Sequence, residues 1–454
     1  MPSARAWILI GVTLRATLLA LAYPVELQSD EAQYALLGLS WERFGFLSDS
    51  QRFLWPPAYP YLHKLGFSLF EAHGVTAVRA LQVICSAGAG WGIASLTTQL
   101  VSERAAPWAT AAWALHLPLA GYCLLGWPEP IFIALVFSAL ALLVQAERTD
   151  QHMKLASAGL LLGVAALFKE LGLAIALVLA LRLAIKRARG ELKELRAAPL
   201  VFIIAVVFPL APWGLRNLER YDKLILSGDT LGENAYHGLN SKDINFDTLP
   251  VLRASNITPR PELSGPDWLK PDEENSWSRP GGTTLKARQS NKLRAATQWA
   301  LENPREFLRT RLTKFAHTFA PLSFPVRHLA LGHINGPLGE GLLGRVFLLI
   351  STIQSAALLL LGFYALARYA PRHSIYWAVS MTLFAQPLLV GMSRLRVPLL
   401  PLLFIALAAW KTRSTPSRGR VSAACLLAAL LILWGIDRES FSWLLNYTWS
   451  TMPS

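Results

Sequence analysis

Residues 6–23 read AWILIGVTLRATLLALAY, an apolar stretch in which Arg15 is the only charged residue. A helix of about 20 such residues crosses the hydrocarbon core of a bilayer. The stretch is longer than the apolar region of a cleavable signal peptide, and no small-residue cleavage site follows it. We therefore expect a retained transmembrane helix here, after which the chain re-enters water close to the acidic pair Asp30-Glu31.

The composition of the whole chain supports the same class of protein. Of its 454 residues 53% are hydrophobic and only 16% are charged, and the mean hydropathy is +0.36. A soluble domain carries roughly 25% charged residues. Backbone groups in lipid must be satisfied within the structure, which leaves helices or closed barrels, and the short alternating strands of a barrel are not visible. The sequence predicts an all-α polytopic membrane protein.

Apolar stretches of membrane-spanning length recur along the chain, and the pattern predicts about eleven transmembrane helices. The predicted spans are residues 6–23, 75–100, 107–125, 129–146, 155–168, 170–186, 199–215, 343–367, 374–391, 397–410 and 421–436. They form an N-terminal module (1–215) and a C-terminal module (343–454), which are separated by a long polar region (216–342). We expect a helix-like basic stretch at 283–320 within that region.

Basic residues mark one side of these spans. They cluster after the sixth, eighth and tenth spans, at Arg182, Lys186, Arg187, Arg189, Lys193, Arg196, Arg368, Arg372, Lys411, Arg413, Arg418 and Arg420. The positive-inside rule assigns these loops to the cytoplasm. The opposite, outer face then carries a first loop (24–74), whose aromatic and proline residues favour short interfacial helices, and the region 216–342.

The charge and the cysteines exclude other classes. The net charge is +14, but basic residues beside spans set topology and meet anionic lipid headgroups, so membrane lipids rather than nucleic acid are the expected partner. Cys85, Cys123 and Cys425 all lie in predicted spans without metal-like spacing. A disulfide framework or a zinc site is therefore not expected.

Charged residues suited to one kind of chemistry gather on the outer face. Transfer of a sugar from a polyprenyl-phosphate carrier needs a carboxylate that takes the proton of the acceptor hydroxyl. It also needs fixed Arg or Lys side chains at the departing lipid phosphate, and an apolar groove for the lipid tail. The sequence offers the following charged groups for these roles: Asp30 or Glu31, Lys169, Arg216, Arg394 and Arg396.

Six motifs in order also resemble a known family. They are Ser29-Asp-Glu-Ala-Gln-Tyr34, Trp55-Pro-Pro-Ala-Tyr-Pro60, Pro128-Glu-Pro130, Phe168-Lys-Glu-Leu-Gly172, Pro212-Trp-Gly-Leu-Arg-Asn217 with the Gly/Asn-rich residues 228–240, and Ser393-Arg-Leu-Arg-Val-Pro-Leu-Leu-Pro401. Together they resemble the GT-C membrane glycosyltransferases, in the branch of the protein O-mannosyltransferases and aminoarabinose transferases. The resemblance implies a GT-C-like bundle and a lipid-phosphate-linked sugar donor.

The resemblance also implies roles for individual residues. Asp30 is implied as the catalytic carboxylate, with Glu31 as a structural or auxiliary acid. The implied donor-phosphate residues are Arg216, Arg394, Arg396 and Lys169, and the implied sugar or acceptor residues are Glu129, Asn234, His237 and Asn240.

The chain departs from the pattern at Trp55, where many relatives carry a Lys that meets the phosphate. Either Arg52, Lys64, Lys169 or another basic group substitutes for that Lys, or the donor headgroup binds differently.

Plainer alternatives stay open at this stage. An acidic pair such as Asp30-Glu31 often begins a helix. A Lys-Glu pair such as Lys169-Glu170 can form a salt bridge within a turn, and an Arg after Pro-Trp, as at Arg216, can anchor a helix at the interface. Glu129 is equally suited to cap the helix that follows it, and His237 to hydrogen-bond within its loop. These alternatives apply to Asp30-Glu31, Lys169-Glu170, Arg216, Glu129 and His237.

The sequence as a whole predicts an inverting glycosyltransferase of the bacterial inner membrane, with its active site on the extracytoplasmic side. Its expected partners are a polyprenyl-phosphate sugar donor, a glycan, lipid or protein acceptor, and membrane lipids. No cofactor is required by the sequence, and a divalent cation is left open because no ligand spacing demands one. The alternatives are a transporter or flippase of a lipid-linked saccharide, and a non-catalytic scaffold.

Overall fold

The computed structural model describes residues 2–23, 25–27, 30–44, 54–192, 195–232, 234–235, 285–339, 341–386, 393–413 and 420–436. Over these ranges the regular structure is helical, and extended backbone pairs only in two isolated bridges, Val25–Ile334 and Leu54–Asp229. The predicted all-α class is thus confirmed for the described part of the chain.

The helices of the N-terminal half are α1 (Ala4–Leu21), α2 (Asp30–Phe44), α3 (Ala58–Phe70), the 3₁₀ helix η1 (Glu71–His73), α4 (Gly74–Leu100), α5 (Ala106–Leu115), α6 (Leu117–Gly121), α7 (Glu129–Thr149), α8 (His152–Phe168), α9 (Leu171–Ala188) and α10 (Ala198–Tyr221). Those of the C-terminal half are α14 (Leu285–Glu302), α15 (Pro304–Phe319), α16 (Phe324–Ala330), α17 (Gly336–Gly339), α18 (Gly341–Tyr369), α19 (Ser374–Ala385), the 3₁₀ helix η5 (Ser393–Leu399), α20 (Leu400–Thr412) and α21 (Arg420–Ile436).

Helices occupy the segments that hydropathy marks as spans. Among the described residues, six helical stretches are long and apolar enough to cross a membrane: Ala4–Leu21, Ala58–Leu100, Glu129–Thr149, Ala198–Tyr221, Gly341–Tyr369 and Arg394–Thr412. The apolar helices α8 and α19 are shorter. The chain therefore has the make-up of a multi-pass membrane protein, while the total of eleven spans remains a prediction.

The predicted span 107–125 is interrupted at its centre, where α5 ends and α6 begins. Pro118 lies in the first turn of α6, where its missing N–H costs little. The Gln354 side chain of α18 bridges the break, since its Oε1 accepts from the N–H of Leu117 at 2.7 Å and its Nε2 donates to the carbonyl of Leu115 at 3.0 Å. His116 Nδ1 accepts from the N–H of Leu119 at 3.1 Å. Side chains thus replace the hydrogen bonds that the helix loses.

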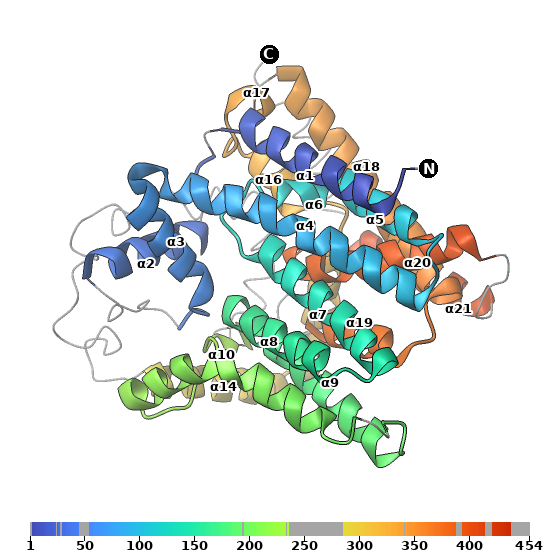
Figure 1. Cartoon of the computed structure of the whole chain (residues 1–454). Coiled ribbons are helices and arrows are strands. Elements are labelled where there is room, and N and C mark those ends of the chain that lie inside the picture. Colours follow the sequence, from blue (N-terminus) through green and yellow to red (C-terminus); the bar gives the residue numbers. More distant parts are fainter. Residues whose placement is uncertain are drawn as a thin grey trace.

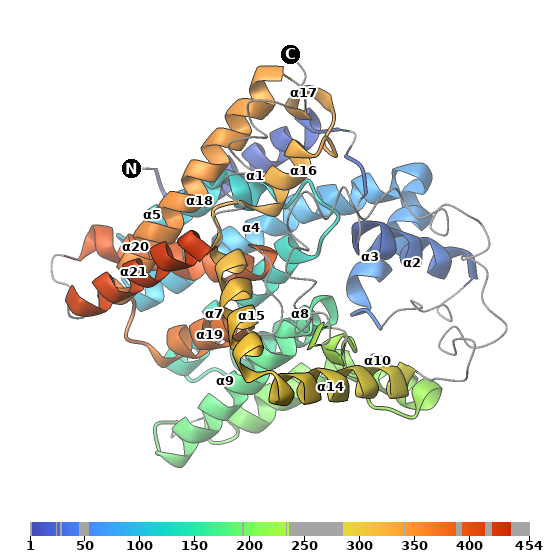
Figure 2. The same cartoon turned by 180° about the vertical axis from the view of Figure 1, so that it is seen from behind.

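Within the core, α4 packs against α7, α7 against α8, and α8 against α10 (Figure 1). The contact between α4 and α7 is close because Gly92 lies against the α7 backbone. A Cβ added there would be 2.6 Å from the carbonyl carbon of Phe137. Small residues let helices approach closely in this way. On the other side of the molecule α15 crosses the bundle beside α21 (Figure 2).

Apolar side chains cover the outward faces of the peripheral helices. Phe208 of α10 and Leu342 of α18 are 73% and 76% exposed. A row of exposed apolar residues on a long helix is the surface that lipid tails solvate. These faces therefore suit a hydrocarbon environment.

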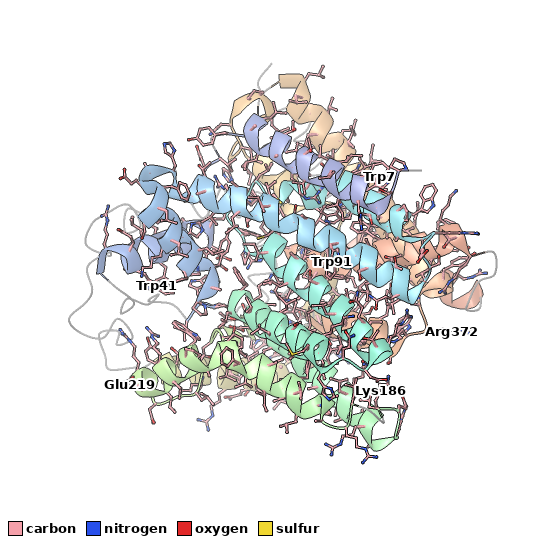
Figure 3. The ribbon with its side chains drawn as sticks, in the orientation of Figure 1. Trp7, Trp41, Trp91, Lys186, Glu219 and Arg372 are labelled. Carbon is pink, nitrogen blue, oxygen red and sulfur yellow. The ribbon has the colours of Figure 1, made fainter. Side chains whose placement is uncertain are left out.

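The two ends of the bundle differ in what they carry. Figure 3 shows Lys186 and Arg372 at one end, and Trp41 and Glu219 at the other. The helices α2 and α3 of the first predicted outer loop lie at the end marked by Trp41 (Figure 1). Two residues from loops predicted to be cytoplasmic thus share one end, and the first predicted outer loop lies at the opposite end.

Candidate active site

Four chain segments bring charged side chains together at the end of the bundle that carries α2. These are the first turn of α2, the first turn of α7, the turn between α8 and α9, and η5. Arg394 Nη1 lies 2.9 Å from Asp30 Oδ2, and Arg394 Nε lies 3.8 Å from Glu129 Oε1. Lys169 Nζ lies 2.7 Å from the same Glu129 oxygen. The four side chains form one linked set, which we call the charge network: Asp30, Arg394, Glu129 and Lys169.

The two carboxylates of the charge network, Asp30 and Glu129, differ in how much of the side chain is exposed. The Asp30 side chain is 27% exposed, whereas that of Glu129 is fully buried. Asp30 can therefore meet a substrate, while Glu129 is enclosed between two cations. Burial lowers the pKa of Lys169, and the negative charge of Glu129 opposes this shift. Glu129 thus favours the cationic form of a Lys side chain whose charge is disfavoured by burial.

Arg394 is held on its other side by an aromatic ring. Its guanidinium carbon lies 4.2 Å from the centre of the Trp127 ring. Trp127 in turn packs against Phe324 at 4.6 Å and lies edge to face with His328 at 6.1 Å between ring centres. Stacking on an aromatic face fixes the plane of a guanidinium, so Arg394 presents its edge to Asp30 in a defined orientation.

Glu31 points to a different partner from its neighbour Asp30. Its carboxylate is fully buried and lies 3.9 Å from Arg79 Nη2, and Arg79 Nη1 donates to the carbonyl of Val25 at 2.9 Å. Arg79 therefore joins the chain before α2 to the first turn of α2. Sequence reasoning missed Arg79, although a signal existed: an Arg inside the predicted span 75–100 is costly unless it is paired.

Two of the predicted phosphate residues, Arg396 and Arg216, contact groups outside the charge network. The Arg396 guanidinium is buried and donates to backbone carbonyls at the end of α15 and just after it, namely those of Thr318, Ala320, Pro321 and Leu322. Arg216 Nη1 donates to Asn217 Oδ1 at 2.8 Å and to the Tyr221 hydroxyl at 3.3 Å, and its guanidinium lies 4.6 Å from the Trp213 ring. The contacts of Arg396 suit a structural role, and those of Arg216 fit the anchor alternative.

The Gly/Asn-rich loop after α10 is described only in part. Asn234 Nδ2 donates to Thr230 Oγ1 at 3.0 Å, and this hydroxyl contacts Glu170. His237 and Asn240, which we predicted as sugar or acceptor residues, lie outside the described residues.

Of the three basic residues named as substitutes for the Lys expected at Trp55, Lys169 belongs to the charge network. Trp55 itself is buried, with its ring 4.6 Å from that of Tyr34. Lys64 lies over the Tyr61 ring at 5.5 Å, and Arg52 lies outside the described residues. Lys169 is the candidate that contacts Glu129.

The described residues contain no group of three His, Cys, Asp or Glu side chains that converge as metal ligands. Asp30 is held by Arg394, and Glu129 by Lys169 and Arg394. A role for a divalent cation therefore stays a prediction, without a described ligand set.

Residues 55–213 match the family of the dolichyl-phosphate-mannose-protein mannosyltransferases. The matched segment contains Arg79, Glu129 and Lys169 but neither Asp30 nor Arg394. The resemblance to GT-C glycosyltransferases that the motifs predicted is thereby confirmed over this segment.

The chain is also similar to two solved structures. The archaeal oligosaccharyltransferase AglB from Archaeoglobus fulgidus, in complex with an inhibitory peptide and a dolichol-phosphate, is 14% identical with a TM-score of 0.48. The match covers 99% of this chain and 56% of AglB. ArnT from Cupriavidus metallidurans, bound to undecaprenyl phosphate, is 14% identical with a TM-score of 0.40, and the match covers 97% and 79% of the two chains. The chain thus spans about half the length of AglB. No curated protein sequence matches it.

Proposed function

We propose that the protein is a membrane glycosyltransferase that moves a monosaccharide from a polyprenyl-phosphate carrier to an acceptor hydroxyl on the extracytoplasmic face. The observation that carries this proposal is the charge network, in which a half-buried carboxylate, Asp30, is joined through Arg394 to the Glu129–Lys169 pair. The family match over residues 55–213 supports the same class of donor.

Asp30 acts as the general base. It takes the proton of the acceptor hydroxyl as the acceptor oxygen forms its bond to the anomeric carbon. The bond between the anomeric carbon and the phosphate oxygen breaks, and its electron pair stays on the lipid phosphate. A single displacement of this kind inverts the configuration at the anomeric carbon.

Arg394 and Lys169 stabilise the negative charge that develops on the leaving phosphate. The network is well arranged for this because Asp30 loses its negative charge when it takes the proton, and Arg394 is then released from its ion pair. The guanidinium that balanced Asp30 in the resting protein becomes available to the phosphate, which gains one negative charge in the same step. The Arg394 guanidinium therefore pairs with Asp30 before the reaction and with the leaving phosphate after the proton has moved.

Glu31, Glu129 and Arg396 support the transfer step indirectly, because they hold the groups that act on the substrate in place. Glu31 and Arg79 hold the start of α2, where Asp30 lies, and Glu129 holds Lys169. Arg396, two residues after Arg394, ties η5 to the C-terminal end of α15 and to the chain that follows it through backbone carbonyls. Removal of these residues is expected to displace the groups that act on the substrate.

The test is the Asp30→Asn variant, purified and supplied with a polyprenyl-phosphate sugar and an acceptor. Loss of the base is expected to lower the transfer rate by a factor of about 10² to 10⁴, in a protein that still shows a cooperative thermal unfolding transition. The exposed Glu219→Gln variant, at the same end of the bundle, is the control and is expected to keep wild-type activity.

A folded Asp30→Asn protein that transfers sugar at the wild-type rate would overturn the proposal. Movement of the intact donor across liposome membranes, without release of the lipid phosphate, would instead support the transporter alternative.

A further inference from the structure

Glu170 and its neighbour Lys169 form the turn between α8 and α9, and their side chains have different partners. Lys169 contacts Glu129 of the charge network. The Glu170 carboxylate accepts from the backbone N–H of Thr230 at 3.1 Å, and the Thr230 hydroxyl lies 2.9 Å from each of its two oxygens. A turn of two residues thus joins the charge network on one side to the chain after α10 on the other.

The chain that contacts Glu170 is docked against several elements. We call residues 225–232 the docked segment. The Ser227 hydroxyl donates to the carbonyl of Ala166 in α8, and Trp213 Nε1 of α10 donates to the carbonyl of Ser227 at 2.7 Å. The N–H of Asp229 donates to the carbonyl of Leu54 in the first outer loop at 2.8 Å.

Gly228 shows how closely the docked segment approaches its neighbours. A Cβ at this position would lie 2.8 Å from the carbonyl oxygen of Leu54 and 2.9 Å from Pro56 Cδ, and it would also overlap with Glu170 Oε1. Only glycine lets the backbone pass between the first outer loop and the α8–α9 turn at this distance.

We propose that Glu170 is a positioning residue that docks residues 225–232 onto the α8–α9 turn and thereby sets the place of Lys169 at the donor phosphate. Glu170 has no part in the proposed transfer step, in which Asp30, Arg394 and Lys169 act. The inference rests on the proposed function for its effect on the donor, whereas the docking contact itself stands on the hydrogen bonds to Thr230. Through Leu54 the same contact couples the two outer loops.

The protonation of Glu170 gives the docking contact a pH dependence. Burial raises the pKa of Glu170 to about 7 against the hydrogen bonds from Thr230, and the charge of Asp229 raises it further. The charged or titratable groups around it are Asp229, which pairs with Lys223 at 2.6 Å, then Lys169 of the same turn and Tyr34 of α2. An undocked Glu170 returns to its ordinary pKa of 4.5, so docking takes up a proton.

The direction of the pH dependence follows from the difference between the docked and the undocked pKa of Glu170. Docking is strongest at low pH, weakens as the pH rises from the undocked to the docked pKa, and is constant above it. Between pH about 6 and about 8 the opening equilibrium of the docked segment is expected to rise about tenfold. Glu170→Gln keeps the shape and an amide oxygen as acceptor but carries no charge, so its docking is expected to be independent of pH.

The experiment measures amide hydrogen exchange of residues 225–232 in the full-length protein, corrected for intrinsic rates, and donor kinetics in parallel. Glu170→Ala is expected to lose protection of this segment by at least tenfold and to raise the KM for the polyprenyl-phosphate sugar. The KM for the acceptor is expected to stay unchanged. Glu170→Gln is expected to restore protection and the donor KM, and to remove the pH dependence. Glu219→Gln, which removes an exposed charge at the same end, is the control.

The outcomes separate this proposal from the proposed function. Wild-type protection of residues 225–232 in Glu170→Ala would overturn the docking role, whatever the activity. Lost protection with an unchanged donor KM would overturn the positioning role. If the wild-type protein transfers no sugar, the proposed function fails, and the exchange data still decide whether Glu170 docks the segment.

Discussion

Arg394 is the residue through which the candidate site is assembled. Its guanidinium contacts Asp30 and Glu129 while it lies on the face of Trp127. A planar cation with several donors can satisfy these directions at once, which a Lys side chain cannot do. At the scale of single residues, the site is therefore an arrangement around one guanidinium.

The sequence identified most of these residues but not their partners. Asp30, Glu129, Lys169 and Arg394 were predicted from topology and motifs, and the structure brings all four together. Their roles in catalysis stay predictions. Arg396 has the same type, the same motif and the same expected face as Arg394, yet it contacts carbonyls. A linear pattern does not fix the direction of two side chains that are separated by one residue in a 3₁₀ helix.

The Lys169–Glu129 pair allows a prediction about stability. The Glu129 side chain is fully buried and that of Lys169 is 12% exposed. Removal of one partner leaves a buried charge poorly compensated, so Lys169→Gln is expected to lower the free energy of unfolding by about 3 kcal/mol. Chemical unfolding in detergent micelles measures this loss.

The double variant Lys169→Gln/Glu129→Gln is the control for that measurement. It removes both charges and is expected to recover a large part of the lost stability, but not the affinity for the lipid-phosphate donor. If the double variant is no more stable than Lys169→Gln, the poorly compensated charge of Glu129 is not the cause of the loss.

The arrangement of the helices depends on where their sequences allow close approach or a break. Apolar length alone predicted a continuous span at 107–125, but α5 and α6 are separated at His116. The break is stabilised by Gln354, which lies in another helix 237 residues away from Leu117. A hydropathy average over neighbouring residues does not contain that contact. The location of spans is therefore predictable from local sequence, whereas their continuity is not.

Two glycines of α4 give a matched test of helix packing. Gly92 lies against the α7 backbone, where an added Cβ would be 2.6 Å from the carbonyl carbon of Phe137. Gly92→Ala forces the two helices apart and is expected to cost about 2 kcal/mol of unfolding free energy. At Gly88, one turn earlier, an added Cβ would be 3.5 Å from Ala134 Cβ, which is ordinary van der Waals contact.

Gly88→Ala is therefore expected to change the unfolding free energy by less than about 1 kcal/mol. Thermal unfolding of both variants in the same detergent provides the comparison. Equal destabilisation by the two substitutions would mean that loss of glycine itself, rather than the contact with α7, determines the effect.

The whole molecule has two chemically distinct ends. One carries Lys186 and Arg372, and the other carries α2, α3 and Glu219 (Figure 3). Positive charge near the ends of spans favours the cytoplasmic side. With this orientation the charge network faces the extracytoplasmic side, as the proposed function requires.

Labelling of single cysteines tests this orientation. In a variant that lacks the three native cysteines, Glu219→Cys is expected to react with a membrane-impermeant maleimide in intact cells. Arg372→Cys, also exposed in the structure, is expected to react only after the membrane is permeabilised. The reverse pattern would place the charge network in the cytoplasm and contradict the predicted topology.

The sequence by itself determined that this protein is helical, that its helices are apolar enough for a membrane, and which charged residues lie near the ends of spans. These properties are local, because each span is fixed by about 20 consecutive residues. Only the tertiary structure decided which charges meet. Asp30 and Arg394 are 364 residues apart, and their contact depends on how α2, α7 and η5 pack, which no local pattern contains. The same packing left Arg396 among backbone carbonyls and brought Arg79 to Glu31.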